Sequence, residues 1–485
     1  MKKLFLFLVF FLGCVSSTLG QVPNCSNVVD QTEPDTSAFS NAGYLQMYLP
    51  NLAGSGNVII VGAVASNGDA ITVTDDKNDT YNLGASQLNN KYVYLFYAAN
   101  VTAGARQVQV HYASDDAYVT GFAFECTNVA LSSTMDEAVS NSGSGTTITA
   151  GSSGTIGSSG DLVVQTYWND SVQFGCGSIN PGSQSNISWA LIQADDSECI
   201  GTQWGVYNST AALNPTMSSA TSGFNSVAIF LKAAAAGTPF STAGIGITCM
   251  KTFWISDNNG SQGQLPRTEQ FPCPGSNNSV IVEWIGGGNG ALSGVSDGNG
   301  NTYSDTGPAV CEPGGGCSST YYAQNAKLTN SQNFTLSGSP DNDTAKIYIV
   351  RNGSTSHFFD KTVTATGTQS SAGNLNAISI TPATPNGLVV SDLGVSSNTI
   401  TGVVGSGQLF MSCLWSSESA GFGGCDENNG WAYFLNPNTS IVNFTWTAND
   451  GIAAQGWVAR ADAFESAVAT GPAPAPPTKL TATVQ

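Results

Sequence analysis

The chain repeats itself once over most of its length, and this duplication restricts its possible folds more than any other feature. Residues 74–81 (TDDKNDTY) are matched by residues 296–303 (SDGNGNTY), so the two tyrosines lie 303 − 81 = 222 positions apart. Residues 161–164 (DLVV) likewise match residues 387–390 (GLVV), 226 positions later. Solenoid repeats are only about 20 to 50 residues long. The longer offset therefore predicts two tandem domains of one fold.

Short segments of alternating or continuous apolar residues, separated by clusters of Gly, Asn, Asp and Ser, predict that both domains are all-β. Examples are Val58–Val64 and Leu162–Tyr167 in the first copy and Val280–Ile285 and Leu388–Val390 in the second. No window keeps helical spacing for three turns. A unit of roughly 210 residues is large for a seven-stranded immunoglobulin-like sandwich, so we expect two tandem jelly-roll-like β-sandwiches.

The domain boundary is expected near the alanine run 233–236, which places the first sandwich at 21–235 and the second at 236–467. Within the first copy, the Ser/Gly-rich run 140–160 predicts an edge hairpin or a long solvated connection. Residues 468–485 are expected to form a Pro-rich linker and one terminal strand.

Residues 1–20 have the pattern of a secretory signal peptide: two lysines, an apolar run from Leu4 to Leu12, and small residues before Gly20. A lipid anchor at Cys14 is the alternative, although residues 11–13 lack the leucine usual three positions before such a cysteine. No later segment is long and apolar enough to span a membrane. We therefore expect a secreted protein, extracellular or at the cell surface.

Ten cysteines remain after residues 1–20 are removed, and in an exported chain disulfides are their usual state. Two pairs are matched between the copies, one pair is a short local loop, and elimination leaves two more. The predicted disulfides are Cys176–Cys199, Cys413–Cys425, Cys311–Cys317, Cys25–Cys126 and Cys249–Cys273. Zinc is the competing use, but the chain has no Cys-x-x-Cys pair and only two histidines.

The chain is acidic and poor in charge. Its formal net charge is −19, and charged residues make up 10% of the sequence, against about a quarter in typical domains. Nucleic acids and anionic membranes both require basic clusters. The composition therefore excludes those partners and leaves an extracellular protein or polysaccharide.

Four oxygen-bearing side chains alternate in the repeated turn of the second copy: Asp297, Asn299, Asn301 and Asp305. A tight loop can point such side chains at a hard cation, so Ca²⁺ is the one candidate cofactor. The first copy has Lys77 where the second has Asn299. The alternative is a β-turn in which Asp and Asn side chains bind main-chain groups.

Aromatic residues follow a predicted disulfide cysteine in each copy: Trp204 and Tyr207 in the first, Trp431 and Tyr433 in the second. Exposed aromatic rings on a β-sandwich can stack on sugars, so these four residues are candidate ligand-binding residues. A core tryptophan packed beside a disulfide is the alternative.

Catalysis has weaker support in the sequence. Neither His111 nor His357 has a counterpart in the other copy, although a Ser or Cys nucleophile usually needs a positioned histidine. No spacing singles out a pair of carboxylates suited to glycoside hydrolysis. We therefore predict no enzymatic activity.

With its repeated turn at residues 73–81 and 295–303, the chain resembles the duplicated β-sandwich modules of large secreted bacterial surface proteins. That resemblance implies an extracellular location and a non-catalytic role. Residues 476–484 (PPTKLTATV) resemble the opening strand of a fibronectin type III module. Such a strand either frays or pairs with a sheet edge of another subunit.

These patterns predict a surface, adhesion, matrix or filament protein. Self-assembly through the C-terminal strand is expected only in the case where that strand pairs with another subunit instead of fraying. The alternative is an extracellular protein that binds or degrades carbohydrate.

Overall fold

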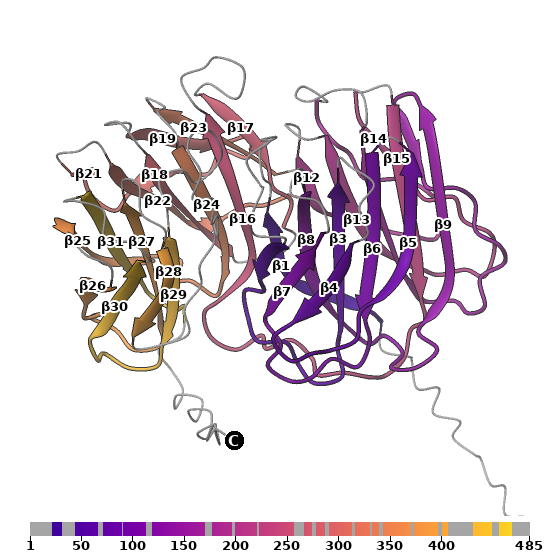
Figure 1. Cartoon of the computed structure of the whole chain (residues 1–485), viewed down its shortest axis with the longest axis horizontal. Coiled ribbons are helices and arrows are strands. Elements are labelled where there is room, and N and C mark those ends of the chain that lie inside the picture. The colour runs from indigo at the N-terminus through magenta and orange to yellow at the C-terminus, as the bar shows by residue number, and fades with distance from the viewer. Residues whose placement is uncertain are drawn as a thin grey trace, which may run out of the picture.

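The two halves of the chain are joined in one central sheet. The computed structural model describes residues 22–467 except 32–43, 66–70, 90, 113–118, 170–176, 196–198, 221–222, 257–265, 274–277, 287–290, 313–315, 330–331, 339–342, 370–372, 396–399, 406–429 and 449–454. All regular elements in these ranges are strands, which confirms the all-β prediction. Figure 1 shows the indigo-to-purple half beside the pink-to-yellow half, with β1 (Asn24–Gln31) next to β16 (Gly246–Ser256).

The first eight strands form sandwich 1, whose strand order is that of a jelly roll. One sheet has the order β5-β6-β3-β8-β1, and the sheet facing it has the order β2-β7-β4. Its remaining strands are β2 (Tyr44–Tyr48), β3 (Val58–Ala65), β4 (Thr72–Asp75), β5 (Asn82–Asn89), β6 (Lys91–Ala98), β7 (Gln107–His111) and β8 (Val119–Thr127).

Sandwich 2 repeats this order in the next seven strands. Its sheets are β12-β13-β11-β15-β9 and β10-β14, and a bridge between Asn180 and Ser218 lies where sandwich 1 pairs β4 with β7. The strands are β9 (Met135–Ser144), β10 (Thr147–Thr149), β11 (Asp161–Trp168), β12 (Ala190–Asp195), β13 (Ile200–Tyr207), β14 (Thr216–Ser218) and β15 (Gly223–Leu231).

Sandwich 3 follows the same scheme in the second half of the chain. Its sheets are β20-β22-β18-β24-β16 and β17-β23-β19, with β21 paired to β22. The strands after β16 are β17 (Arg267–Gln270), β18 (Asn278–Gly286), β19 (Leu292–Asp297), β20 (Ser304–Asp305), β21 (Val310–Cys311), β22 (Cys317–Ala326), β23 (Asn333–Gly338) and β24 (Asp343–Arg351).

Sandwich 4 completes the series with sheets β29-β27-β31-β25 and β26-β30-β28. Its strands are β25 (Phe359–Gln369), β26 (Gly373–Ile380), β27 (Gly387–Val395), β28 (Ile400–Gly405), β29 (Gly430–Asn436), β30 (Val442–Ala448) and β31 (Gln455–Phe464). Each predicted domain therefore holds two sandwiches of one strand order instead of a single large one, and the division of the chain at residue 235 stays a prediction.

The central sheet joins sandwiches 1 and 3 through β1 and β16, which run parallel with Val28 opposite Cys249. Because β1 and β16 are equivalent strands that run parallel, a rotation about an axis along them relates the two halves of the chain. Such a rotation keeps the strand direction but exchanges the two faces of the central sheet. The small sheets of sandwiches 1 and 3 therefore cover opposite faces of it. One core packs the central sheet against the large sheet of sandwich 2 and the small sheet of sandwich 3. The other packs it against the small sheet of sandwich 1 and the large sheet of sandwich 4.

This layering explains the apolar patterns of the strands. The central strands β3 and β18 are buried throughout because both faces of the sheet are covered. The outer strand β7 alternates between buried and half-buried residues because one of its faces meets solvent.

The Ser/Gly-rich run 140–160 contains the predicted long solvated connection, because residues 150–160 link β10 to β11 without a strand and most of them are exposed. Strand β9 is an edge strand of the large sheet of sandwich 2, but it does not form a hairpin with β10, which pairs with β14 in the facing sheet. The chain crosses between the two sheets at this point, as it must in a jelly roll.

Three predicted disulfides are confirmed: Cys25–Cys126, Cys249–Cys273 and Cys311–Cys317. Cys199 is buried, and its predicted partner Cys176 lies outside the described residues, as does the predicted pair Cys413–Cys425. In the ranges that the structure describes, no helix is long and apolar enough to cross a membrane.

Candidate functional site

The repeated turn has the same hydrogen bonds in both halves. In the first copy, Oδ1 of Asp75 accepts the main-chain N–H groups of Lys77 at 2.9 Å and Asp79 at 3.0 Å, and Oδ2 accepts the hydroxyl of Tyr81 at 3.1 Å. The backbone conformation is also shared, because Asn78 has φ 60° and its counterpart Gly300 has φ 75°. Asn and Gly tolerate this left-handed geometry better than other residues do.

In the second copy, Asp297 has the same role. Its Oδ1 accepts the N–H groups of Asn299 at 2.9 Å and Asn301 at 3.2 Å, and its Oδ2 accepts the hydroxyl of Tyr303 at 2.8 Å. Burial and the adjacent Asp297 carboxylate raise the pKa of the Tyr303 phenol above its ordinary value. The tyrosine hydroxyl therefore stays a hydrogen-bond donor.

Two of the other three predicted calcium ligands, Asn299 and Asn301, also hold the turn. The side-chain amide of Asn299 donates to the carbonyl of Lys327 at 3.1 Å, and Asn301 accepts the N–H of Lys327 at 2.8 Å. Asp305 is exposed in β20 and pairs with Tyr321. Within the described residues, no three His, Cys, Asp or Glu side chains form a group suited to a metal ion. These contacts favour the hydrogen-bonded turn, and calcium binding stays a prediction.

The four candidate aromatic residues lie on the strands that cover the central sheet. Tyr207, Trp431 and Tyr433 are buried, with exposures of 3%, 0% and 4%, and Trp204 is half-buried. Tyr433 donates its hydroxyl to the carbonyl of Pro50. Sugar stacking requires an exposed ring face, so this burial favours the core-packing alternative for three of the four residues.

Strand register also changes which aromatic residues correspond. Trp204 lies opposite Val164 of β11, whereas Tyr433 lies opposite Val390 of β27. Because Val164 and Val390 occupy the same place in the repeat, the structural counterpart of Trp204 is Tyr433. The sequence alone matches Trp204 with Trp431, which lies 431 − 204 = 227 positions later. This match is wrong by two residues, because the number of residues before the strand differs between the copies.

A shallow pocket of about 300 Å³ lies between sandwiches 1 and 2. Its lining residues include Tyr97 and the polar residues Asn82, Ser132 and Ser133. Tyr97 is partly buried against the core. An aromatic residue beside hydroxyl-bearing and amide-bearing residues is the residue combination of many sugar-binding sites.

Sequence reasoning missed the buried charged groups. Between the central sheet and sandwich 4, Glu283 and Lys346 lie opposite each other on β18 and β24, and Asp392 lies on β27. Burial raises the pKa of Asp392 to about 8 and raises that of Glu283. Burial also lowers the pKa of Lys346 to about 7. A dry interior disfavours the charged form of each group.

These buried groups are held by specific partners. The hydroxyl of Tyr348 donates to Oε2 of Glu283 at 2.6 Å, and Ser318 donates to Oδ2 of Asp392 at 2.7 Å. A third buried carboxylate, that of Asp462 on β31, has its Oδ2 3.3 Å from Nε of the buried Arg460 on the same strand.

A second buried cluster lies where the halves of the chain meet. Nζ of Lys251 on β16 lies 3.5 Å from Oδ2 of Asp30 on β1 and 3.2 Å from Oε2 of Glu269 on β17. All three side chains are fully buried. The available sequence signal was a single charge within an apolar strand, as in VIVEWI (280–285) and ITCMKTF (247–253). Because charged residues are rare in this chain, a single charged residue within an apolar strand indicates a side chain buried in the interior.

Comparison with known proteins gives no match to a family model, a curated protein or a solved structure.

Proposed function

We propose that this chain is an extracellular, non-catalytic structural protein, a component of a surface, matrix or filament that acts in adhesion. The observation that carries the proposal is the seam between β1 and β16, where one sheet continues through both halves. A sheet shared in this way transmits load between sandwiches through main-chain hydrogen bonds instead of through a flexible linker.

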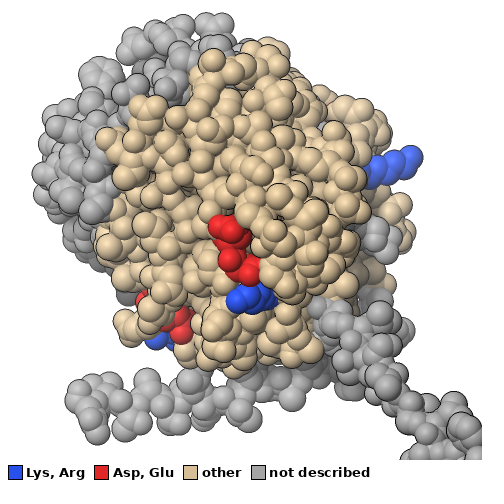
Figure 2. All heavy atoms as spheres, turned by 90° about the vertical axis from the view of Figure 1, so that its right-hand side faces the viewer, with Lys and Arg blue, Asp and Glu red and all other residues tan. Residues whose placement is uncertain are grey.

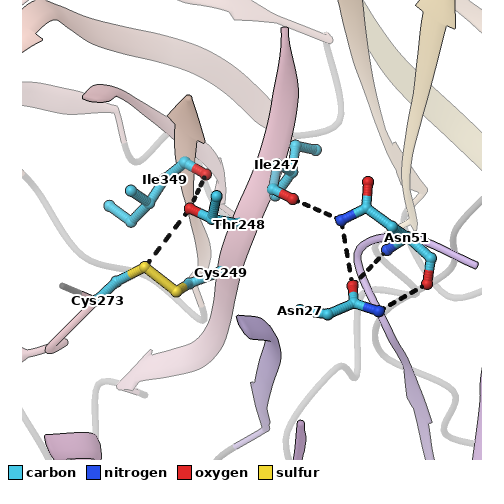
Figure 3. Close-up of a disulfide and its surroundings, with 7 residues drawn as sticks. All are labelled: Asn27, Asn51, Ile247, Thr248, Cys249, Cys273 and Ile349. Atoms are coloured by element: carbon cyan, nitrogen blue, oxygen red, sulfur yellow. Dashed lines mark hydrogen bonds between the residues drawn. A yellow bond between two sulfur atoms is a disulfide. The ribbon is translucent and has the colours of Figure 1, made fainter. Parts of the chain in front are cut away.

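Side chains and disulfides reinforce this seam. The side-chain amide of Asn51 donates to the carbonyl of Ile247 on β16 at 2.7 Å, and the main-chain N–H of Asn51 donates to Oδ1 of Asn27 on β1 at 2.6 Å (Figure 3). Cys25 ties β1 to β8, and Cys249 ties β16 to Cys273. Disulfides persist in oxidising compartments, which supports an extracellular location.

The surface supports contacts made by hydrogen bonds more than by charge. On the face in Figure 2, the described residues include few Lys, Arg, Asp or Glu side chains. Surfaces of this kind suit a protein or polysaccharide partner with many hydroxyl and amide groups.

For self-assembly, the proposed donor is the C-terminal strand 479–485, which lies outside the described residues. The proposed acceptor is β5, which ends the central sheet and carries the exposed side chains of Leu83 and Leu88. An edge strand offers its main-chain groups to a further strand.

Electron microscopy of the purified full chain tests this version. We expect polymers that are lost both on deletion of 479–485 and in the variant Leu83→Asp with Leu88→Asp. Ile441→Asp is the matched control, since Ile441 is equally exposed but lies outside β5. Polymers that survive the deletion would rule out the terminal strand as donor.

The second candidate function is carbohydrate binding, favoured by the pocket beside Tyr97. Glycan-array binding that is retained in Tyr97→Phe and lost in Tyr97→Ala would support it, because both rings can stack on a sugar and alanine cannot. Equal binding by the two variants would remove the pocket from consideration.

A further inference from the structure

The seam contains a lysine, an aspartate and a glutamate arranged for a covalent reaction. Lys251 and Asp30 are directly opposite each other in the parallel register of β16 and β1. The lysine nitrogen lies 3.5 Å from Oδ2 of Asp30, and Glu269 Oε2 lies 3.2 Å from the same nitrogen. We infer that Lys251 and Asp30 condense to an intramolecular amide, an isopeptide bond, with Glu269 as the proton carrier.

The lysine nitrogen is fixed in place. Besides the two carboxylates, it donates to the carbonyls of Ala194 at 3.2 Å and Gln270 at 3.3 Å. The carbon to be attacked is bonded to the Asp30 oxygen that the amine already touches. Holding a nucleophile beside the group that it attacks removes much of the entropy loss that an uncatalysed reaction must undergo.

The aspartate is oriented by a second side chain. Gln193 donates its amide N–H to Oδ1 of Asp30 at 2.7 Å, and the carbonyl of Gln193 accepts the hydroxyl of Thr202 at 3.0 Å. When the amine attacks, Oδ1 takes on negative charge. The Gln193 amide is therefore a donor aimed at the oxygen where that charge develops.

The reaction balances without any added reactant. A proton passes from the lysine ammonium to Oδ2 of Asp30, which leaves a neutral amine and a carboxylic acid. The amine then attacks Cγ, and Glu269 takes a proton from the nitrogen. Collapse of the tetrahedral intermediate expels Oδ2, which accepts that proton from Glu269 and leaves as one water molecule. Glu269 ends as it began, as a carboxylate.

The condensation removes one buried ion pair and leaves the Glu269 carboxylate beside the N–H group of the new amide. Two opposite charges inside a protein are costly to desolvate, and the condensation replaces them with one neutral amide. The bond would close a covalent loop between positions 251 − 30 = 221 residues apart. It would join sandwich 1 to sandwich 3 across the seam, whether or not the chain assembles further.

Peptide mapping of the full chain, with its disulfides reduced and alkylated before digestion, tests the inference. Trypsin does not cut after an acylated lysine, so the cross-linked chain should yield a branched peptide that joins the fragment ending at Lys77 to residues 233–267. Its mass should be lower than the sum of the two fragments by one water molecule. Separate fragments 233–251 and 252–267, with no branched species, would overturn the inference and leave the three residues as an ion cluster.

Variants separate the roles of the three residues. Lys251→Arg should abolish the branched peptide, and Glu269→Gln should reduce it at least tenfold while both partners remain. Lys232→Arg is the matched control and should leave the yield unchanged, because Lys232 Nζ bonds only to the carbonyl of Ser133 among the contacts described for it. Full yield in Glu269→Gln would refute the assignment of the proton carrier, and the wild-type digest is decisive even where a variant fails to fold.

Discussion

Removing the carboxylate of Asp297 tests whether hydrogen bonds hold the repeated turn. This carboxylate accepts two main-chain N–H groups, the side-chain amide of Asn301 at 2.7 Å and the hydroxyl of Tyr303 at 2.8 Å. Each such bond contributes about 0.5–1.5 kcal/mol to stability. Water can replace the main-chain partners in the exposed part of the turn, so we expect Asp297→Ala to lower the free energy of unfolding by about 2–3 kcal/mol.

The tyrosine gives a matched single-bond variant. Tyr303→Phe removes only the hydroxyl and should cost about 1 kcal/mol. Because the two groups contact each other, the double variant should cost less than the sum of the two single variants. Asp305→Asn is the control and should change stability little, since Asp305 is exposed in β20.

Urea unfolding in calcium and in chelator provides the readout. If hydrogen bonds hold the turn, the difference between the wild type and Asp297→Ala is the same in both solutions. If chelator lowers the wild type to the stability of the variant, a bound cation carries the effect and the hydrogen-bond reasoning is refuted.

Two further outcomes follow from the interior. Asp392 has its pKa raised to about 8 by burial, so the folded state holds a proton that the unfolded state releases, and stability falls as pH rises from about 4 to 8. Asp392→Asn, which resembles the protonated acid, should flatten that fall and stabilise the chain at pH 7 by about 1–2 kcal/mol; a denaturation series against pH with an unchanged slope would contradict this. Replacing Cys25 and Cys126 by alanine should cost about 2–5 kcal/mol, measured by urea unfolding, and an unchanged midpoint would show that the bridge does not constrain β1.

Local patterns were sufficient to predict the central, fully buried strands. The predicted segments Val58–Val64 and Val280–Ile285 lie within β3 and β18, because continuous apolar runs of this length are typical of strands covered on both faces. The pairing of Cys311 with Cys317 was equally predictable, since a short loop leaves few alternatives.

The candidate sites were harder to predict. Calcium loops and hydrogen-bonded turns both have alternating Asp and Asn residues, so the sequence does not separate them. The structure favours the turn, because the Asp297 carboxylate accepts hydrogen bonds from Asn299 and Tyr303. The correspondence of Trp204 depended on loop length, which differs between the copies, so sequence spacing selected Trp431 where strand register selects Tyr433.

The sequence by itself determined that the chain is all-β, that it repeats, and which of its cysteines pair in three cases. These properties depend on residue spacing, which is visible along the chain. Tertiary structure alone decided that one strand order occurs four times and that β1 and β16 run side by side. It also placed Asp30 against Lys251, because strand register brings together residues whose distance in sequence carries no signal of contact.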